Sequence, residues 1–502
     1  MTAPSEIIAP DHRTRAEVRR GKVGIGFKLL YAGGAVGDGI TNTALSLFLL
    51  FYLTSVCGLS GTVAGAALLL GLVIDAIADP VIGLLSDNTR SRFGRRLPYI
   101  VLSTLPLALA FGLLFSVPSG LSGSAVAAYV FACGLALRLG MSFFTLPFVS
   151  VGAEVTDNYD DRSSIVSFRV TFTMIGTFLA IALGLGVFMT GPDGLMDRAA
   201  YAAFGWTGAA VIVIGGVSAA LATRSVLPRL HLAEPGSGFA PGRFLREILG
   251  IFRSRSFIIL FIGTVAFCVG QGMASAMAIH LNHYFWKLPA SAVQLILLGL
   301  AVGPFIGAPL TVLLARFLDK KPLAILFFLV FILSQLWPPL AAIAGLMPAD
   351  PGVLVPVLLT NSLVTGLSLI GGAICAQSMM ADAADEYEFL FGARREGLFY
   401  AGLSFATKAS SGVGGFLAGV ALDLIHFPAQ GAGQADAPLS QATRIGLGLL
   451  AGPVPALITL LGVIAVLFYS LGRDKHRAIV AELEHRRSTP SPGASAEILP
   501  EA

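Results

Sequence analysis

Two carboxylates lie four residues apart in an apolar stretch of the chain, within residues 71–96. Asp75 and Asp79 are followed by an arginine-rich segment that reads TRSRFGRR. At this spacing both side chains project from nearly the same face of a helix, which gives an oxygen-rich patch suited to a bound cation or a shared proton. Ionisable residues inside a membrane line cavities or pair with other charges. Pairing of one aspartate with an intramembrane arginine or lysine is therefore the alternative.

Three further polar residues interrupt apolar runs elsewhere. Asp38 lies near the middle of the first run, and Asn42 follows one helical turn later, after glycines that allow a neighbouring helix to approach closely. Lys408 lies among small residues in FATKASSGVGGF. Each of the two charged residues is expected to face a cavity, water or a charged partner.

An arginine lies within the apolar stretch ALRLGMSFFTLPFVSVGAEV. Ser142, Thr145 and Val149 follow Arg138 at steps of four, three and four residues, so all four side chains share one helix face. Two interpretations remain open. Arg138 forms an internal ion pair with Asp38 or Asp75, or it lines a water-filled cavity and contacts a substrate.

These residues must be positioned by membrane-spanning helices. The chain has 502 residues, 55% apolar and 12% charged, and a mean hydropathy of +0.81, which predicts an all-α polytopic membrane protein. Apolar runs of about 20 residues predict twelve transmembrane helices near 25–55, 62–88, 98–117, 124–152, 166–192, 203–227, 256–286, 290–317, 322–346, 352–383, 396–426 and 443–471.

The order of the polar breaks predicts the domain organisation. A cytoplasmic arm (1–22), a six-helix bundle (23–227), a linker rich in Pro, Gly and Arg (228–255), a second six-helix bundle (256–472) and a tail (473–502) follow one another. Weak similarity between the halves predicts two pseudo-symmetric bundles around a central site. The tail is expected to form a short helix and then to be disordered.

The distribution of Lys and Arg predicts the orientation. Most of the 33 Lys and Arg residues fall in the terminal segments and in alternate loops, which places both termini in the cytoplasm. The net charge of +4 therefore reflects topology, and no nucleic-acid partner is expected. The chain lacks nucleotide-binding and catalytic signatures, and its four cysteines have no paired spacing. We expect neither an enzyme nor a cofactor nor a metal site.

Charged residues also gather in the predicted cytoplasmic loops. Asp87, Arg90 and Arg95 follow the second helix, and the segment 157–169 is expected to be a charged loop. A third group, partly at the end of the tenth helix and partly in the next loop, comprises Asp382, Asp385, Glu388, Arg395 and Glu396. Such clusters can hold neighbouring helices together and release them, so we interpret them as a gate.

Several motifs together resemble a known family. They are KLLYAGGAVGD and LLFYLTSVCGLS in the first helix, DAIADPVIG with TRSRFGRR, LPFVSVGAEV, DRSSIVSFR, and ADAADEYEF with REG. On these motifs, the chain from about residue 25 to residue 470 resembles proteins of the major facilitator superfamily and, within it, the glycoside-pentoside-hexuronide:cation symporters. The resemblance implies the major facilitator fold and cation-coupled sugar transport in the cytoplasmic (inner) membrane.

The resemblance also implies a cation-coupling site. Asp75 and Asp79 match the family's cation ligands, with Ser142 assisting and Lys408 beside them. Ala78 stands where a sodium-coupled member has an asparagine, so the expected coupling ion is H+ rather than Na+. The family's gating charges correspond to Arg169, Asp382, Asp385, Glu388 and Glu396.

The sugar site departs from the galactoside carriers of this family. The positions of their two aspartates hold Gly39 and Thr145 here, and their tryptophan position holds Val149. Because an arginine suits a carboxylate, Arg138 favours a uronate, another acidic saccharide or another small anion. The candidate substrate residues are Asp38, Asn42, Arg138, Thr145, Val149 and Arg169.

The expected protein is a monomeric symporter that binds membrane lipid and a small-molecule substrate, and that moves the substrate by alternating access. An amphipathic lysolipid-like cargo is the main alternative, which Val149 favours. A receptor that binds without transport is a third hypothesis, disfavoured by the short tail.

Overall fold

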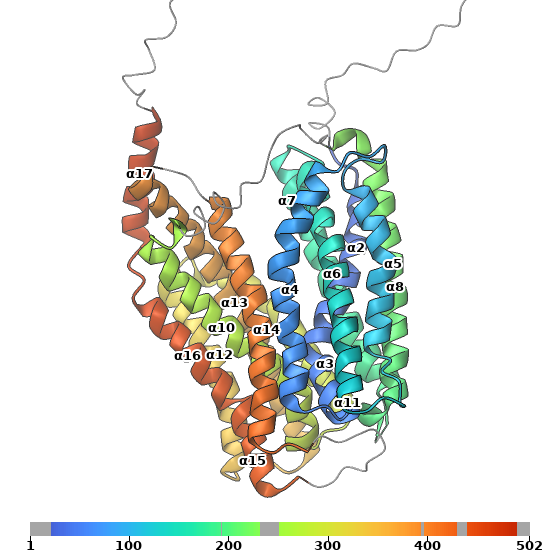
Figure 1. Cartoon of the computed structure of the whole chain (residues 1–502). Coiled ribbons are helices and arrows are strands. Elements are labelled where there is room, and N and C mark those ends of the chain that lie inside the picture. The colour runs from blue at the N-terminus through green and yellow to red at the C-terminus, as the bar shows by residue number, and fades with distance from the viewer. Residues whose placement is uncertain (1–21, 192, 231–249, 393–395, 429–438, 489–502) are drawn as a thin grey trace, which may run out of the picture. The chain divides into compact units, whose positions relative to one another are not determined.

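The computed structural model describes residues 22–191, 193–230, 250–392, 396–428 and 439–488. Within these ranges the chain is helical and has no strand (Figure 1). Eleven helical segments of the described chain are long and apolar enough to cross a membrane. The predicted N-terminal arm, most of the linker, and Arg395 of the predicted gate lie outside the described residues.

The eleven spans agree with the predicted runs to within a few residues at most ends. They are Ile25–Val56 (α2, η1, α3 and η2), Gly61–Asn88 (α4), Leu97–Leu114 (α5), Ser124–Glu154 (α6), Tyr159–Phe188 (α7 and η3), Arg198–Ser225 (α8), Arg255–Phe285 (α10 and η6), Ala290–Leu314 (α11), Lys320–Ile343 (α12), Pro351–Phe391 (α13) and Gln441–Leu467 (α15 and α16). The twelfth predicted span forms α14, Glu396–Leu424. The start of the tail forms α17, Arg473–Ser488.

Two segments predicted as loops or loop borders are helical, which corrects the sequence analysis. Most of 157–169 belongs to α7, because the Asn158 side chain caps the helix by accepting a hydrogen bond from the backbone N–H of Asp161. The motif ADAADEYEF lies wholly inside α13, which ends at Gly392 in the left-handed conformation (φ +71°) that favours glycine. The sequence predicted loops in these two segments because acidic residues are also common in loops.

The chain packs as two compact units. The first comprises 1–44, 73–184 and 199–237, and the second comprises 45–72, 185–198 and 238–502. Two of the changes from one unit to the other fall inside π-helical segments, η1 (Ala44–Phe48) and η3 (Gly184–Phe188). The predicted boundaries at 227 and 256, drawn from composition alone, stay a prediction.

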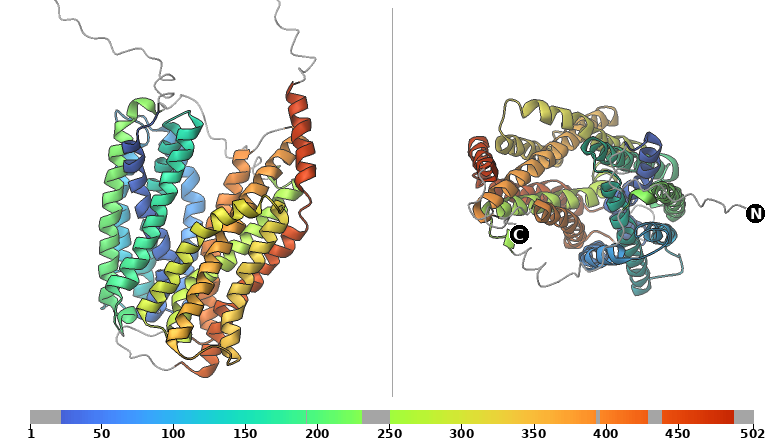
Figure 2. Two further views of the ribbon diagram at one scale, coloured as in Figure 1. Left: turned by 180° about the vertical axis from the view of Figure 1, so that it is seen from behind. Right: turned by 90° about the horizontal axis from the view of Figure 1, so that it is seen from above.

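In the first unit α2 packs along α7, and α5 packs along α6 (Figure 2). Glycine makes the first contact possible. A Cβ added to Gly39 would lie 2.1 Å from the backbone oxygen of Thr173, and one added to Gly176 would lie 2.2 Å from the oxygen of Val36. The glycines of the first helix therefore do permit a close helix contact, as predicted.

In the second unit α11 packs on α13, α10 packs on α14 and α16, and α12 packs on α13. A cluster of buried aromatic and aliphatic residues around Phe257, Phe331 and Phe399 fills its core. Residues 61–72 of α4 also belong to this unit, where Gly65 lies against the backbone of Phe416 in α14. These contacts fix the helices that carry the polar residues described below.

Candidate functional site

An ion pair within the first unit joins two of the predicted residues. Nη1 of Arg138, on α6, lies 3.2 Å from Oδ2 of Asp75, on α4. The Asp75 side chain is 12% exposed and that of Arg138 is 23% exposed. Of the two interpretations of Arg138, the structure therefore contains the internal pair with Asp75.

The other predicted cation ligands lie on the same two helices. Asp79 is half-buried one turn after Asp75, directly before Pro80, which lacks an N–H and leaves the carbonyl four residues earlier without its usual helical donor. Ser142 is buried on α6, one turn after Arg138. Carboxylate, hydroxyl and guanidinium groups are thus combined on α4 and α6.

Two predicted substrate residues, Asp38 and Thr145, share a small enclosed cavity. It measures about 10 Å³, room for about one water molecule, and lies between α2, α5, α6 and α8. Oδ1 of Asp38 accepts a hydrogen bond of 2.9 Å from Nδ2 of Asn42. The cavity itself is too small to hold a sugar.

The remaining substrate candidates lie apart from this cavity. Val149 is 38% exposed on α6. Arg169, on α7, lies against the hydroxyl of Tyr31, which itself donates a hydrogen bond of 3.0 Å to the backbone oxygen of Phe148. Arg169 therefore links α7 to α2 and, through Tyr31, to α6.

The arginine-rich turn after α4 forms a compact charge cluster with α6. Glu154 Oε1 accepts from Nη2 of Arg95 at 2.8 Å and from Nη2 of Arg96 at 2.6 Å. Arg96 also reaches Asp87 at 2.7 Å and Ser86 at 3.0 Å. Glu154, which the sequence analysis did not select, is the centre of this cluster. Arg90, by contrast, is exposed.

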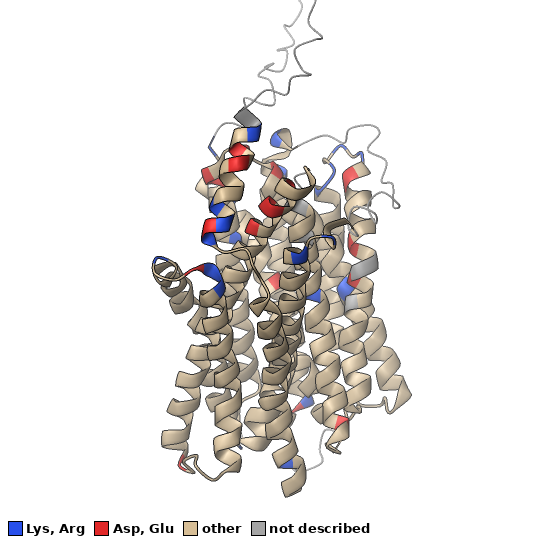
Figure 3. Cartoon of the chain, turned by 90° about the vertical axis from the view of Figure 1, so that its left-hand side faces the viewer, with Lys and Arg blue, Asp and Glu red and all other residues tan. Residues whose placement is uncertain are grey.

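The acidic residues near the end of α13 bind basic residues of α12 and α17 in the second unit. Asp382 accepts two hydrogen bonds of 2.7 Å from Nζ of Lys320, at the start of α12. Asp385 lies 3.0 Å from Nε2 of His476, on α17. Glu386, also missed from sequence, binds Lys475 of α17 at 2.9 Å. Figure 3 shows that charged residues gather toward the helix ends and are sparse along the middles of the helices.

A tyrosine lies close to this acidic group. Burial and the nearby carboxylates of Asp382, Glu386 and Asp319 raise the pKa of Tyr469 well above its usual range. Its hydroxyl therefore stays protonated and donates a hydrogen bond of 3.1 Å to the backbone oxygen of Met379. The tyrosine joins the segment before α17 to α13.

Two of the remaining predicted residues lie on α13 and α14. Glu388 is half-buried on α13, and Lys408 is exposed on α14 in the second unit. Glu396 starts α14, but its side chain lies outside the described residues, as does Arg395. No group of three or more His, Cys, Asp or Glu side chains in the described ranges is arranged to hold a metal ion.

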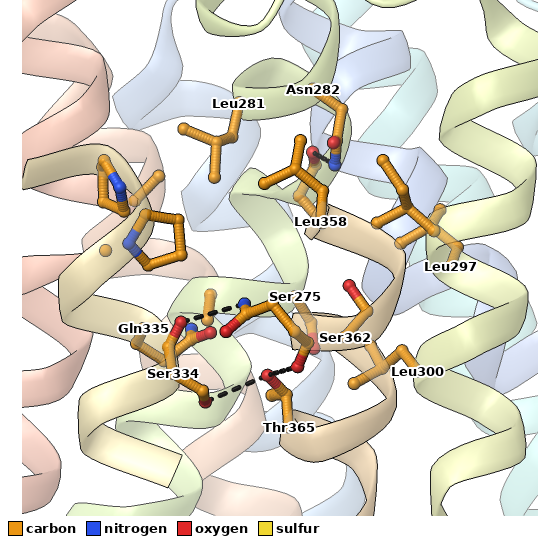
Figure 4. A pocket seen from close by; sticks show the side chains of 18 of the residues that line it. Ser275, Leu281, Asn282, Leu297, Leu300, Ser334, Gln335, Leu358, Ser362 and Thr365 are labelled. Carbon is orange, nitrogen blue, oxygen red and sulfur yellow. Dashed lines mark hydrogen bonds between the residues drawn. The ribbon is translucent and has the colours of Figure 1, made fainter. Parts of the chain in front are cut away.

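The second unit contains a polar pocket that the sequence analysis did not predict. It has a volume of about 140 Å³ and lies between α10, η6, α11, α12, α13 and the α15–α16 break (Figure 4). Its polar lining residues are all uncharged: Gln271, Ser275, Asn282, Ser334, Gln335, Asn361, Ser362 and Thr365. Amides and hydroxyls at scattered positions give no sequence signal, whereas charges in apolar runs do.

Comparisons with known proteins agree with a transporter fold. The uncharacterized symporter sll1374 of Synechocystis is 29% identical and covers 92% of this chain and 96% of its own length. The glucuronide carrier protein homolog of Escherichia coli is 25% identical, over 91% of this chain and 95% of its own length. The sodium-dependent lysophosphatidylcholine symporter 1 of Gallus gallus is 24% identical, over 95% of this chain and 91% of its own length. A crystal structure of a D-xylose-proton symporter has a TM-score of 0.57 at 16% identity, covers 89% of this chain and 97% of that chain, and shows the fold alone.

Apolar helices of membrane-spanning length, with an ion pair between two of them, are those of an integral membrane protein. The family model described as MFS/sugar transport protein matches residues 30–473, so the chain belongs to the major facilitator superfamily, within the glycoside-pentoside-hexuronide:cation symporter family. Proteins of this family are transporters and not enzymes, and they bind small-molecule substrates.

Proposed function

We propose that this chain couples the entry of a proton to the transport of an acidic sugar or glycoside. The observation that carries the proposal is the ion pair between Asp75 and Arg138. Protonation of Asp75 would remove its charge and release Arg138. The freed guanidinium could then bind the carboxylate of a uronate, because arginine pairs with carboxylates through two parallel hydrogen bonds.

Coupling follows from the charges. With Asp75 ionised, Arg138 is already neutralised, and an anionic substrate would compete with an internal carboxylate. With Asp75 protonated, the anion replaces that carboxylate and the net charge of the loaded site is unchanged. An uncompensated charge opposes closure in a low-dielectric membrane interior, so only the empty or the doubly loaded site would pass between the two orientations.

A proton is favoured over sodium because Ala78 supplies no amide oxygen between the two aspartates. We propose Asp79 and Ser142, on the same two helices as the pair, as the groups that tune this site, and the predicted coupling role of Lys408 stays a prediction.

We further propose that residues 23–227 and 256–472 act as two bundles that alternate access to the site. We also propose that the transporter lies in the cytoplasmic (inner) membrane with both termini in the cytoplasm, and that it acts as a monomer.

The test uses the full chain in proteoliposomes with imposed proton or sodium gradients and a panel of glucuronides, neutral glycosides and lysolipids. We expect uptake of an acidic sugar driven by the proton gradient. Asp75→Cys should abolish accumulation, whereas Asp193→Cys, at an exposed aspartate between α7 and α8, should not. Full proton-driven uptake by Asp75→Cys would refute the coupling role.

An amphipathic lysolipid is the second candidate cargo. Val149, 38% exposed on α6, presents an apolar side chain on the same face as Arg138, and one relative is named for a sodium-dependent lysophosphatidylcholine symporter. Saturable uptake of a lysolipid that acidic sugars do not inhibit would favour this cargo over the first.

A further inference from the structure

The polar pocket of the second unit has hydrogen-bonding groups that the protein itself does not use. Nδ2 of Asn361 donates to the backbone oxygen of Ser334 at 3.0 Å, and Oγ1 of Thr365 donates to Oγ of Ser334 at 2.9 Å, so these groups join α12 to α13. The side chains of Gln335 and Ser362 also line the pocket. Neither has a hydrogen-bond partner among the described residues.

A second hollow adjoins this pocket on the outer face of the same helices. It has a volume of about 520 Å³ and lies between α12 and α13, lined mainly by apolar side chains that include Leu333, Trp337 and Val364. These three are 59%, 41% and 38% exposed. Ser334 and Asn361 line both hollows, so these two hydrogen-bonded residues form the wall between the polar pocket and the apolar groove, and a ligand that fills both hollows must part them.

The surroundings of the groove identify its occupant. Both α12 and α13 are membrane-spanning helices, and an exposed apolar groove on such helices is filled by lipid chains rather than by water. The indole of Trp337 satisfies its N–H internally by donating to Oδ1 of Asn361 at 2.8 Å. Its ring is therefore free to pack against an acyl chain.

The chemistry of the pocket limits the headgroup. Among the residues that the structure describes, no Lys, Arg, His, Asp or Glu lines either hollow. Ser334 lies nine residues from the end of α12 at Ile343, which is about 14 Å along the helix axis at about 1.5 Å per residue. A phosphate or a carboxylate at this depth would lack a partner for its charge, whereas hydroxyls can bond to Gln335 and Ser362.

We propose that the pocket and groove together form a binding site for a membrane lipid with an uncharged, hydroxyl-bearing headgroup. The headgroup occupies the pocket beside Gln335 and Ser362, and one acyl chain lies in the groove between α12 and α13. The site shares no residue with the candidate transport residues of the first unit. It is therefore an additional lipid site, and its existence does not depend on which substrate is transported.

The test is photolabelling of the full chain in phosphatidylcholine vesicles that contain a monoacylglycerol with a diazirine on its acyl chain. Peptide mapping should place the label on α12 and α13. Val364→Trp, which fills the groove, should reduce this labelling at least tenfold, whereas Val353→Trp, at an exposed valine of α13 outside the groove, should not change it.

Two gentler variants test the headgroup contacts. Gln335→Met and Ser362→Ala remove groups that have no internal partner, so folding should be preserved. Each should weaken labelling about fivefold, the effect of one lost hydrogen bond of about 1 kcal/mol. A lysophosphatidylcholine with the same diazirine chain should label this region much less. Equal labelling by both lipids, or labelling that none of the groove and pocket variants changes, would overturn the proposal.

Discussion

The pair between Asp75 and Arg138 gives a prediction whose size can be derived from its geometry. Two unit charges 3.2 Å apart attract each other by about 5 kcal/mol at an effective dielectric constant of about 20. Desolvation opposes this attraction, and the Arg138 side chain keeps 23% of its exposure. We therefore expect a net coupling of about 2 kcal/mol, within the usual range for residues in contact.

A double-mutant cycle measures this coupling. Asp75→Asn and Arg138→Gln should each destabilise the purified protein, because each leaves a partly buried charge without its partner. The double variant should be less destabilised than the sum of the two by about 2 kcal/mol, measured as unfolding free energies in detergent. A cycle on Asp160 and Arg138, whose side chains form no recorded contact, supplies the control. Additive losses at Asp75 and Arg138 would refute an energetically significant pair.

Transport measurements extend the same cycle to function. Asp75→Asn mimics a permanently protonated carboxyl, so substrate exchange across the membrane should continue while accumulation driven by a proton gradient is lost. Arg138→Gln should lower the affinity for an acidic substrate and leave a neutral analogue unaffected. Preserved proton-driven accumulation in Asp75→Asn would show that the pair is purely structural.

Three further predictions concern positions that hold the helices in place. Glu154→Gln should destabilise the protein by about 2 kcal/mol, because Arg95 and Arg96 lose their shared acceptor. The measurement is thermal unfolding, with Glu482→Gln, at an exposed i,i+4 ion pair, as the control. An unfolding temperature of Glu154→Gln equal to that of the control would contradict this role of the cluster. Asp423→Ala should cost about 1 kcal/mol, since its carboxylate accepts from the backbone N–H groups of Gly61 and Thr62 at 2.7 Å at the start of α4; unaltered unfolding would contradict this capping role. Gly39→Asp should prevent correct packing of α2 on α7, since even a Cβ at this position meets the Thr173 oxygen at 2.1 Å; normal expression and a normal elution profile in size-exclusion chromatography would show that α7 moves to accommodate it.

Hydropathy predicted the helices well because a membrane requires long apolar runs with internal hydrogen bonds. It failed at helix ends such as Asn158 and Gly392, where a capping side chain or a left-handed glycine extends or stops a helix independently of hydropathy. The π-helical segments at 44–48 and 184–188 were likewise not predicted, because hydropathy does not distinguish a π-helical turn from an α-helical one.

Charged residues at depth were the most predictable part of the site. An isolated arginine in an apolar run requires a partner, and Asp75 was one of two candidates for Arg138 that spacing alone could not separate. Glu154 and Glu386 were overlooked because they lie among other charges near helix ends, where a carboxylate carries no particular signal. Only the fold shows that one accepts from two arginines and the other holds α17.

The pocket of the second unit shows why a site lined by uncharged polar residues escapes sequence analysis. Serine, threonine, asparagine and glutamine are tolerated in membrane helices because they can bond to the helix backbone, as Thr365 does to the oxygen of Asn361 at 2.8 Å. Their presence therefore does not require a ligand. The signal is instead the absence of an internal partner at Gln335 and Ser362, together with their location in a pocket. Both facts depend on how α12 and α13 pack, so a binding site built from amides and hydroxyls becomes visible only when the helices are placed against each other.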